Sequence, residues 1–225
     1  MRGKYNYNSL KVQISDSFFF EKMTALDIIY HFYPEDTPLR QLLLLHSRCV
    51  ADKAMAILHH YEESLPEGET PLRVDRQLVV DGAMLHDIGI SRCDARGILC
   101  EGTEPYICHG TIGAQMLRDY CAELEREGKI SSGVDFEACA RICERHTGAG
   151  LTAQNILDQQ LSISPVRDLL PETPEEQLVC LADKFYSKSG NPSKEKDIDR
   201  VRRSMQKFGA DSTERFEALC TQFYV

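Results

Sequence analysis

The amino-acid sequence predicts an all-α fold, and three observations support this prediction. Long segments carry apolar residues three or four positions apart, which is the spacing of the buried face of a helix. Residues that favour helix ends stand at the borders of these segments, with threonine or proline at the start and glycine at the end. No run of residues alternates between apolar and polar over the length of a strand.

Seven segments are expected to form helices, and most have a recognisable beginning or end. Pro38 opens the first in a first-turn position, and Gly89 ends the second. Gly128 stops the third, and the turn at Thr147–Gly150 closes the fourth. The fifth begins with Thr173, a cap that is followed by carboxylates that complement the helix dipole. The expected ranges are 38–64, 74–87, 109–128, 135–146, 173–190, 196–209 and 212–223.

Residues 1–22 differ from the rest of the chain, because they are polar and aromatic and lack a helical period. We expect them to be an appendage, or Met23 to be the native start, which the intact mass of the native protein would test. Residues 23–225 are expected to form one domain with a C-terminal helical extension. A chain of 225 residues is long enough to bury one sizeable core.

The composition argues against several classes of protein. A formal net charge of −9 disfavours nucleic-acid binding through a broad basic surface. No apolar stretch approaches the ~20 residues that span a bilayer, so no membrane partner is expected. The nine cysteines show no paired spacing, which favours the reducing cytoplasm. Cys139 and Cys143, one helical turn apart, are interpreted as small buried residues. The sequence does not indicate an oligomeric state.

Histidine and aspartate recur at helix ends or on apolar stretches of five successive expected helices. In chain order these residues are His46, His86 with Asp87, His109, His146 and Asp183. Their distribution suits a bundle with a site between facing helices. A buried, unpaired His-Asp doublet is costly unless a partner or an ion compensates it. Each residue also has an ordinary explanation, as a hydrogen-bonded core histidine or, for Asp183, as a partner of Lys184. Composition and spacing therefore allow a metal site without naming an activity.

Five segments in order resemble the HD superfamily of metal-dependent phosphohydrolases, in its branch of small stand-alone HDIG-motif proteins. The segments are HSRCVADKA, AMLHDIGIS, HG, RHTGAGLT and CLADKF, and the resemblance runs from about Met23 to the C-terminus. It implies an HD-domain helical bundle with a metal site between facing helices. It also implies metal ligation by His46, His86, Asp87 and Asp183, with His109 and His146 on a second ion that Asp87 bridges to the first. If the site holds only one ion, His109 and His146 would instead orient the phosphate or water.

The resemblance implies hydrolysis of a phosphate ester, as a phosphomonoesterase or phosphodiesterase acting on a nucleotide or another small phosphorylated molecule. One or two divalent ions would activate water; Fe, Mn, Ni and Zn suit these ligand types, and Mg is also compatible. The expected catalytic residues are Asp87, His109, His146 and Lys184. Lys184 and Lys188, in a basic run after Asp183, are expected to bind the substrate phosphate.

Two alternatives to a hydrolase stay open. The same six residues match the ligand set of HD-fold oxygenases that use a mixed-valence di-iron site. The second alternative is a non-catalytic HD module used in signalling. The presence of all the expected metal-ligand residues argues against it.

Overall fold

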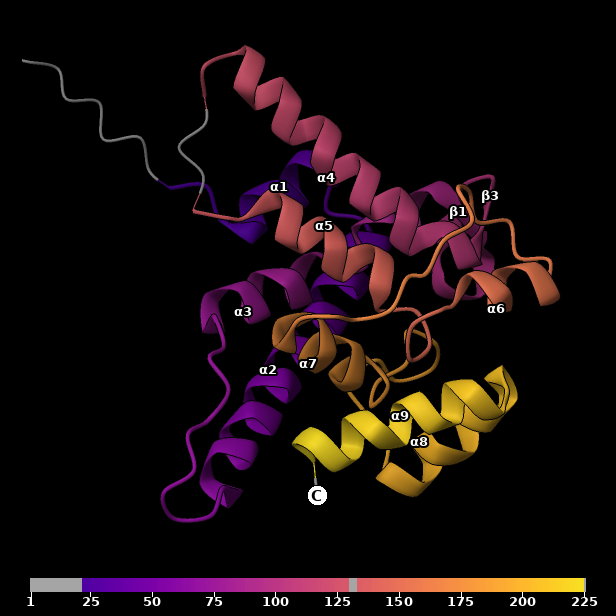
Figure 1. Cartoon of the computed structure of the whole chain (residues 1–225). Coiled ribbons are helices and arrows are strands. Elements are labelled where there is room, and N and C mark those ends of the chain that lie inside the picture. The colour runs from indigo at the N-terminus through magenta and orange to yellow at the C-terminus, as the bar shows by residue number, and fades with distance from the viewer. Residues whose placement is uncertain (1–21, 130–132, 225) are drawn as a thin grey trace, which may run out of the picture.

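The computed structural model describes residues 22–129 and 133–224, and it is mostly helical, as expected (Figure 1). The expected appendage therefore lies, apart from Lys22, outside the described residues. The α-helices are α1 (Ala25–Phe32), α2 (Pro38–Ser64), α3 (Arg76–Leu85), α4 (His109–Arg126), α5 (Phe136–Arg145), α6 (Ala153–Asp158), α7 (Pro174–Asp183), α8 (Ile198–Met205) and α9 (Ala210–Phe223). The 3₁₀ helices are η1 (Ile88–Arg92), η2 (Arg96–Ile98), η3 (Tyr106–Cys108) and η4 (Gln206–Phe208).

A small sheet between α3 and α4 was not expected from the sequence. Strand β1 (Cys93–Ala95) pairs antiparallel with β2 (Cys100–Glu101) and parallel with β3 (Glu104–Pro105). Strands of two or three residues are too short to show alternation, which is why the sequence pattern missed them. Helices α1 and α6, of 8 and 6 residues, were also not predicted.

The fifth expected helix is shorter than predicted. Helix α7 ends at Asp183 rather than at Gly190. The chain leaves the helix because the Phe185 ring is fully buried in the core, while the Phe185 carbonyl accepts a hydrogen bond from the backbone N–H of Lys196. The resulting loop carries Lys188 back to Asp87. By contrast, α2 has the predicted bounds, and the other predicted helices differ by a few residues at their ends.

Side-chain caps fix where several helices start. The hydroxyl oxygens of Thr37 and Thr173 accept backbone N–H groups at the starts of α2 and α7, each of which has proline in its first turn. The carboxylates of Asp75, Asp135 and Asp197 do the same for α3, α5 and α8. Each such cap stabilises a helix by about 1 kcal/mol. These caps fix where α2, α3, α5 and α7 begin, whereas the clustered His and Asp side chains on these helices lie mid-helix or at their other ends.

Two apolar cores meet along α2. One core contains Leu43 of α2 and residues of α1, η1, α4 and α5. The other contains Val50 of α2 and residues of α3, α7, α8 and α9, including the fully buried Phe216. His46 lies between Leu43 and Val50 on this helix. The polar cluster described below therefore lies where the two cores join.

Two glycines allow the backbone to approach closely beside the His-Asp doublet. A Cβ atom at Gly89 would lie 2.2 Å from the carbonyl oxygen of His109, and one at Gly110 would lie 2.4 Å from that of Cys143. Both distances are far below van der Waals contact. Glycine therefore lets η1 pack on the start of α4, and α4 pack on the end of α5, beside which it runs (Figure 1).

Within the described residues, no helix combines the length and the apolar character needed to cross a bilayer.

Candidate metal centre

The structure brings all six predicted His and Asp side chains into one cluster. Five of them are buried, and the Asp183 side chain is 12% exposed. They form two groups whose ligand-type atoms lie within 4.8 Å of one another: His46, His86, Asp87 and Asp183, and then Asp87, His109 and His146. Helices α2, α4 and α7 carry His46, His109 and Asp183, and the other three residues directly follow the ends of α3 and α5. The expected site between facing helices is thus present in the geometry.

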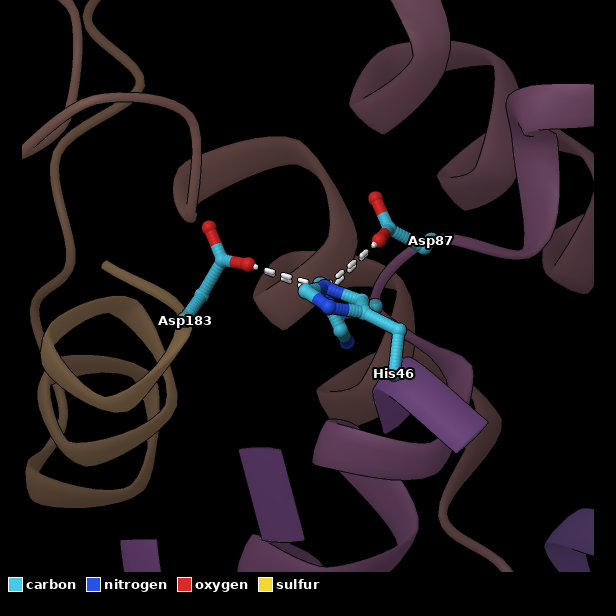
Figure 2. Close-up of side chains that lie close together, drawn as sticks. His46, Asp87 and Asp183 are labelled. Carbon is cyan, nitrogen blue, oxygen red and sulfur yellow. Dashed lines mark hydrogen bonds and ion pairs between the residues drawn. The ribbon is translucent and has the colours of Figure 1, made fainter. Parts of the chain in front are cut away.

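The first group is centred on His46 and is shown in part in Figure 2. Two carboxylates approach the His46 ring from opposite sides: its Nε2 lies 3.1 Å from Asp183 Oδ1 and 3.2 Å from Asp87 Oδ2. His86 Nε2 lies 3.0 Å from Asp87 Oδ2 and 3.5 Å from Asp183 Oδ1. Two imidazole nitrogens and two carboxylate oxygens therefore converge on one small volume.

The second group uses the other oxygen of the same carboxylate. Asp87 Oδ1 lies 3.3 Å from His109 Nε2 and 3.6 Å from His146 Nε2. The two histidine nitrogens are 3.0 Å apart. Asp87 therefore stands between the groups, with Oδ2 toward the first and Oδ1 toward the second.

Three of the histidines are oriented by the same local contact. His86, His109 and His146 each follow the last residue of a helix, where backbone carbonyls lack helical partners. Each Nδ1 lies 2.6–2.7 Å from the carbonyl oxygen three residues earlier, at Ala83, Tyr106 and Cys143. Because a carbonyl can only accept, Nδ1 carries a proton, and Nε2 is the ring nitrogen that faces the cluster. This arrangement is typical of metal-ligating histidines.

Burial decides the charge of the second pair of histidines. Burial lowers the pKa of His109 to about 3, although the charge of Asp87 acts in the opposite direction. Burial also lowers the pKa of His146. Both rings are therefore neutral at pH 7, with two Nε2 lone pairs facing each other and Asp87 Oδ1. Such an arrangement of acceptors is unfavourable unless a positive charge lies among them.

The carboxylates make the first group attract cations. Burial alone would lower the pKa of His86, but the charges of Asp87 and Asp183 raise it to about 9. The pKa of Asp87 is well below its usual range: burial would raise it, and the charges of His86 and Lys188 outweigh burial.

Unsatisfied buried atoms show that a divalent metal ion fits this cluster. His86 Nε2 and Asp87 Oδ1 are buried and make no hydrogen bond of acceptable geometry to the described residues, and Asp87 Oδ2 has the ion pair with Lys188 that is described below. Buried polar atoms of this kind are rare in folded proteins and call for an explanation such as an ion. The donor set of imidazole nitrogens and carboxylate oxygens suits a divalent ion.

Both lysines expected to bind phosphate lie at this cluster. Lys188 Nζ forms an ion pair with Asp87 Oδ2 at 2.6 Å, and Lys184 Nζ forms one with Asp183 Oδ2 at 2.6 Å. Lys184 also donates to the carbonyl oxygen of His146. Burial would lower the pKa of Lys188, and the charge of Asp87 raises it above its usual value. Farther along the basic run, Arg202 pairs with Glu217 instead.

A cavity of about 640 Å³ opens beside Asp183, Lys184 and Lys188. Sequence reasoning did not single out Tyr106, which lines this cavity and whose ring stacks on that of His109, with centroids 4.6 Å apart. Lys196 belongs to the basic run after Asp183 but was given no role of its own; its Nζ donates to the carbonyl oxygens of Lys184 and Tyr186. The position of Tyr106 three residues before His109 was the available signal, since Nδ1 of His109 contacts its carbonyl. No sequence signal indicated that Lys196 would bind the backbone of this loop.

The turn at Thr147–Gly150 and the two neighbouring cysteines lie where the sequence predicts them. Gly148 and Gly150 both have positive φ, of 61° and 80°, so the turn ends the α5 segment with residues that tolerate left-handed backbone. Gly148 also lines the cavity. Cys139 and Cys143 are fully buried in the apolar core.

Comparisons with known proteins place the chain among relatives of mixed description. Residues 43–187 match the family described as HD domain. An uncharacterized protein from Methanocaldococcus jannaschii is 34% identical over 148 residues, covering 64% of this chain and 72% of that protein. No solved structure gives a significant match.

Two further relatives are described as tRNA (cytidine(56)-2′-O)-methyltransferase. The one from Picrophilus torridus is 36% identical over 113 residues, covering 50% of this chain and 25% of that protein. The one from Thermoplasma volcanium is 28% identical over 199 residues, covering 88% and 45%. This chain thus spans less than half the length of either methyltransferase. The family match covers well over half of the chain and contains all six clustered residues, so the chain belongs to the HD domain family.

Proposed function

We propose that this protein is a metal-dependent hydrolase of a phosphate ester, acting as a phosphomonoesterase or phosphodiesterase on a nucleotide or another small phosphorylated molecule. The observation that carries the proposal is the meeting of six His and Asp side chains beside a lysine-lined cavity. Membership of the HD domain family supports it.

The two groups that share Asp87 would hold one or two divalent ions. His46, His86, Asp87 and Asp183 would bind the first, and Asp87, His109 and His146 the second. When bound, such ions lower the pKa of a water molecule and polarise a phosphoryl oxygen. The mixture of imidazole and carboxylate suits Fe, Mn, Ni or Zn, and Mg is also compatible.

The side chains around the ions have separate tasks. We assign substrate-phosphate binding to Lys184 and Lys188, which line the cavity and form ion pairs with the carboxylates. An ammonium group has three N–H donors, and Lys184 uses two on Asp183 and on the His146 carbonyl, which leaves one for a phosphate oxygen. Asp87, His109 and His146 would orient the attacking water and the phosphate from the buried side.

Substitution of Asp87 tests the proposal directly. Asp87→Ala should abolish phosphate-ester hydrolysis and lower the metal content while the protein stays helical, because two apolar cores surround the site. Hydrolysis of 4-nitrophenyl phosphate and bis(4-nitrophenyl) phosphate, metal content by mass spectrometry and circular dichroism provide the readouts. Asp81→Asn is the control, since Asp81 lies on α3, is buried and, within the part of the chain that the structure describes, has a side-chain hydrogen bond to Gln77 alone. Turnover close to wild type in Asp87→Ala would refute the assignment.

The proposed substrate is a small molecule rather than a nucleic acid. The formal charge of −9 disfavours a long polyanion. Two relatives are nevertheless named for methylation of a tRNA, so tRNA belongs in the assay. We expect no retention of labelled tRNA at 0.15 M salt, together with hydrolysis of at least one nucleotide or sugar phosphate.

A di-iron oxygenase is the second candidate, because the same six residues satisfy its ligand formula. The hydrolase and the oxygenase can be distinguished by anaerobic purification, followed by iron analysis and measurement of oxygen uptake. Oxygen consumption without phosphate release would favour the oxygenase. A folded protein that binds no metal when purified without chelator would favour the non-catalytic module.

A further inference from the structure

The cavity beside the metal centre has walls from two distant parts of the chain. Ile98 of η2 and Tyr106 of η3 line one part, and Met205, Lys207 and Phe208, at the end of α8 and in η4, line another. The segment from Asp183 to Ser189 lies between them in sequence and carries the lysines next to the carboxylates. A cavity of about 640 Å³ is much larger than one phosphate group needs and falls within the usual range of small-molecule sites.

The lining of the cavity combines basic and apolar side chains. Lys184 and Lys188 are ion-paired with the carboxylates of the metal centre. Ile98, Met205 and Phe208 supply apolar surface, and Phe208 is 47% exposed, which is unusual for a phenylalanine that lines a cavity. Among the described residues Lys207 makes no ion pair, so its charge is available to an anion that enters. The lining therefore suits a molecule with a phosphate at one end and an apolar body at the other.

The apolar wall of α8 and η4 lies outside the part of the chain that matches the family. The match ends at residue 187, and Met205, Lys207 and Phe208 follow it by about 20 residues. Figure 1 shows α8 and α9 together at the C-terminal end, next to α7. The metal-binding residues thus come from the shared domain, whereas one wall of the cavity comes from the extension.

We propose that this C-terminal wall determines which phosphate ester the protein accepts, by selecting esters whose alcohol part carries an aromatic ring. The phosphate lies against Lys184 and Lys188, and the ring lies between the surfaces of Ile98 and Phe208. This inference rests on the proposed function for the chemistry of the phosphate end. The selection for a ring rests on the cavity itself.

Binding of two phosphonates, whose carbon–phosphorus bond the proposed reaction cannot cleave, tests this inference apart from catalysis. The protein purified without chelator should bind phenylphosphonate about ten times more tightly than methylphosphonate in calorimetry, as expected for partial burial of one ring. In Phe208→Ser this ratio should fall to about two. Gly97 also lines the cavity, and a Cβ atom there meets open space. Gly97→Leu should therefore lower the ratio too, because the leucine side chain would occupy space that the ring needs.

A control and a parallel hydrolysis assay make each outcome decisive. Leu157→Ser removes an apolar side chain that is 57% exposed on α6, outside the cavity lining, and should keep the wild-type ratio. Any of three results would overturn the inference. The wild type could bind the two phosphonates equally well, it could bind neither, or both cavity variants could keep the wild-type ratio of affinities. If the ring preference is present but neither phenyl phosphate nor methyl phosphate is hydrolysed, the proposed function fails and the ring-selective site stands.

Discussion

At the scale of single residues, the chemistry depends on which nitrogen of each histidine faces the cluster. His86, His109 and His146 all use Nδ1 on a carbonyl of the preceding turn, and this leaves Nε2 for the site. His46 lies mid-helix, and its Nδ1 makes no hydrogen bond to the described residues. Its ring is placed instead by the two carboxylates and by the packing of α2.

Removal of either histidine of the second group tests whether two ions bind. His109→Ala and His146→Ala should each lower the metal-to-protein ratio from about two towards one, because each leaves Asp87 with a single remaining histidine in that group. Metal analysis after gel filtration measures the ratio. A ratio that stays the same while kcat falls would assign these histidines to orientation of the substrate.

The buried histidines also predict how stability depends on pH after metal removal. The folded-state pKa of His109 is about 3, well below the ~6.5 of an unfolded chain, so the unfolded state takes up the proton first as pH falls. Its contribution is present above pH ~6.5 and is lost progressively between ~6.5 and 3. His86, with a folded-state pKa of about 9, contributes below pH ~6.5 and loses that contribution as pH rises through 9.

Urea denaturation of the chelator-treated protein across pH 4–9 measures both effects. We expect the midpoint to fall on acidification below pH ~6.5, and to fall again above pH ~8. His109→Gln should flatten the acid side, because glutamine does not titrate. The same acid slope in His109→Gln and wild type would show that other groups control it.

At the scale of elements, close backbone contacts and short clamps hold the site. Tyr33, next to the end of α1, donates its hydroxyl hydrogen to the carbonyl oxygen of Ile88 at 2.7 Å and accepts from the backbone N–H of Ser91. This phenol fixes η1 directly after the His-Asp doublet. Gly89 then lets η1 lie against α4, which brings Asp87 to His109.

Substitution of Gly89 should separate the parts of the centre. In Gly89→Ala the added methyl group would collide with the His109 carbonyl and with the backbone of Gly113, neither of which can move like a flexible side chain. We expect destabilisation of about 1–3 kcal/mol, typical of overpacking, and weaker metal binding. Thermal denaturation and metal titration measure these effects. Gly97→Ala, at a position with open space, is the control and should be neutral.

The loop after α7 has its own clamp, which Lys196 provides. Its ammonium donates to the carbonyl oxygens of Lys184 and Tyr186, and its backbone N–H donates to the carbonyl of Phe185. Lys196→Met keeps the backbone bond and removes the other two, so Lys184 and Lys188 should lose their fixed positions. We expect a several-fold rise in KM for phosphate esters with a smaller change in kcat. A fall in kcat alone would contradict this role.

At the scale of the whole molecule, the C-terminal extension belongs to the core and is more than an appended segment. Phe216 and Phe223 of α9 and Met205 of α8 are buried against residues of α2 and α7. Phe216→Ala should therefore lower the free energy of unfolding by about 3–5 kcal/mol, as for other large-to-small core changes. Urea denaturation measures the loss. A change below about 1 kcal/mol would mean that the extension packs loosely.

Much of the architecture and the candidate site could be predicted from the sequence, because both depend on signals that are local in sequence. Helix α2 shows its period over 27 residues and begins with a threonine-proline pair, and its bounds were predicted correctly. The six His and Asp residues were found because each stands at a helix end or on an apolar stretch, in an order that resembles one family. The prediction that these six side chains meet in one site depended on that resemblance as well as on their spacing.

The features that the sequence did not reveal depend on contacts between distant segments. Helix α7 ends at Asp183 because Phe185 enters a core built from α2 and α9, which no local pattern shows. Lys196 donates a hydrogen bond to a carbonyl ten residues earlier, and Phe208 lines the same cavity as Ile98 and Tyr106, which are distant from it in the chain. Such pairings are set by the packing of the whole molecule.

The contact between each histidine and its own helix end has a dynamic consequence. The carbonyls of Ala83 and Cys143 belong to the last turns of α3 and α5, and that of Tyr106 belongs to η3. When a final turn frays, the imidazole loses the partner that holds its tautomer and direction. Release of a bound ion and local unfolding of these turns should therefore be coupled. A bound ion should then slow local unfolding at three turns that are far apart along the polypeptide.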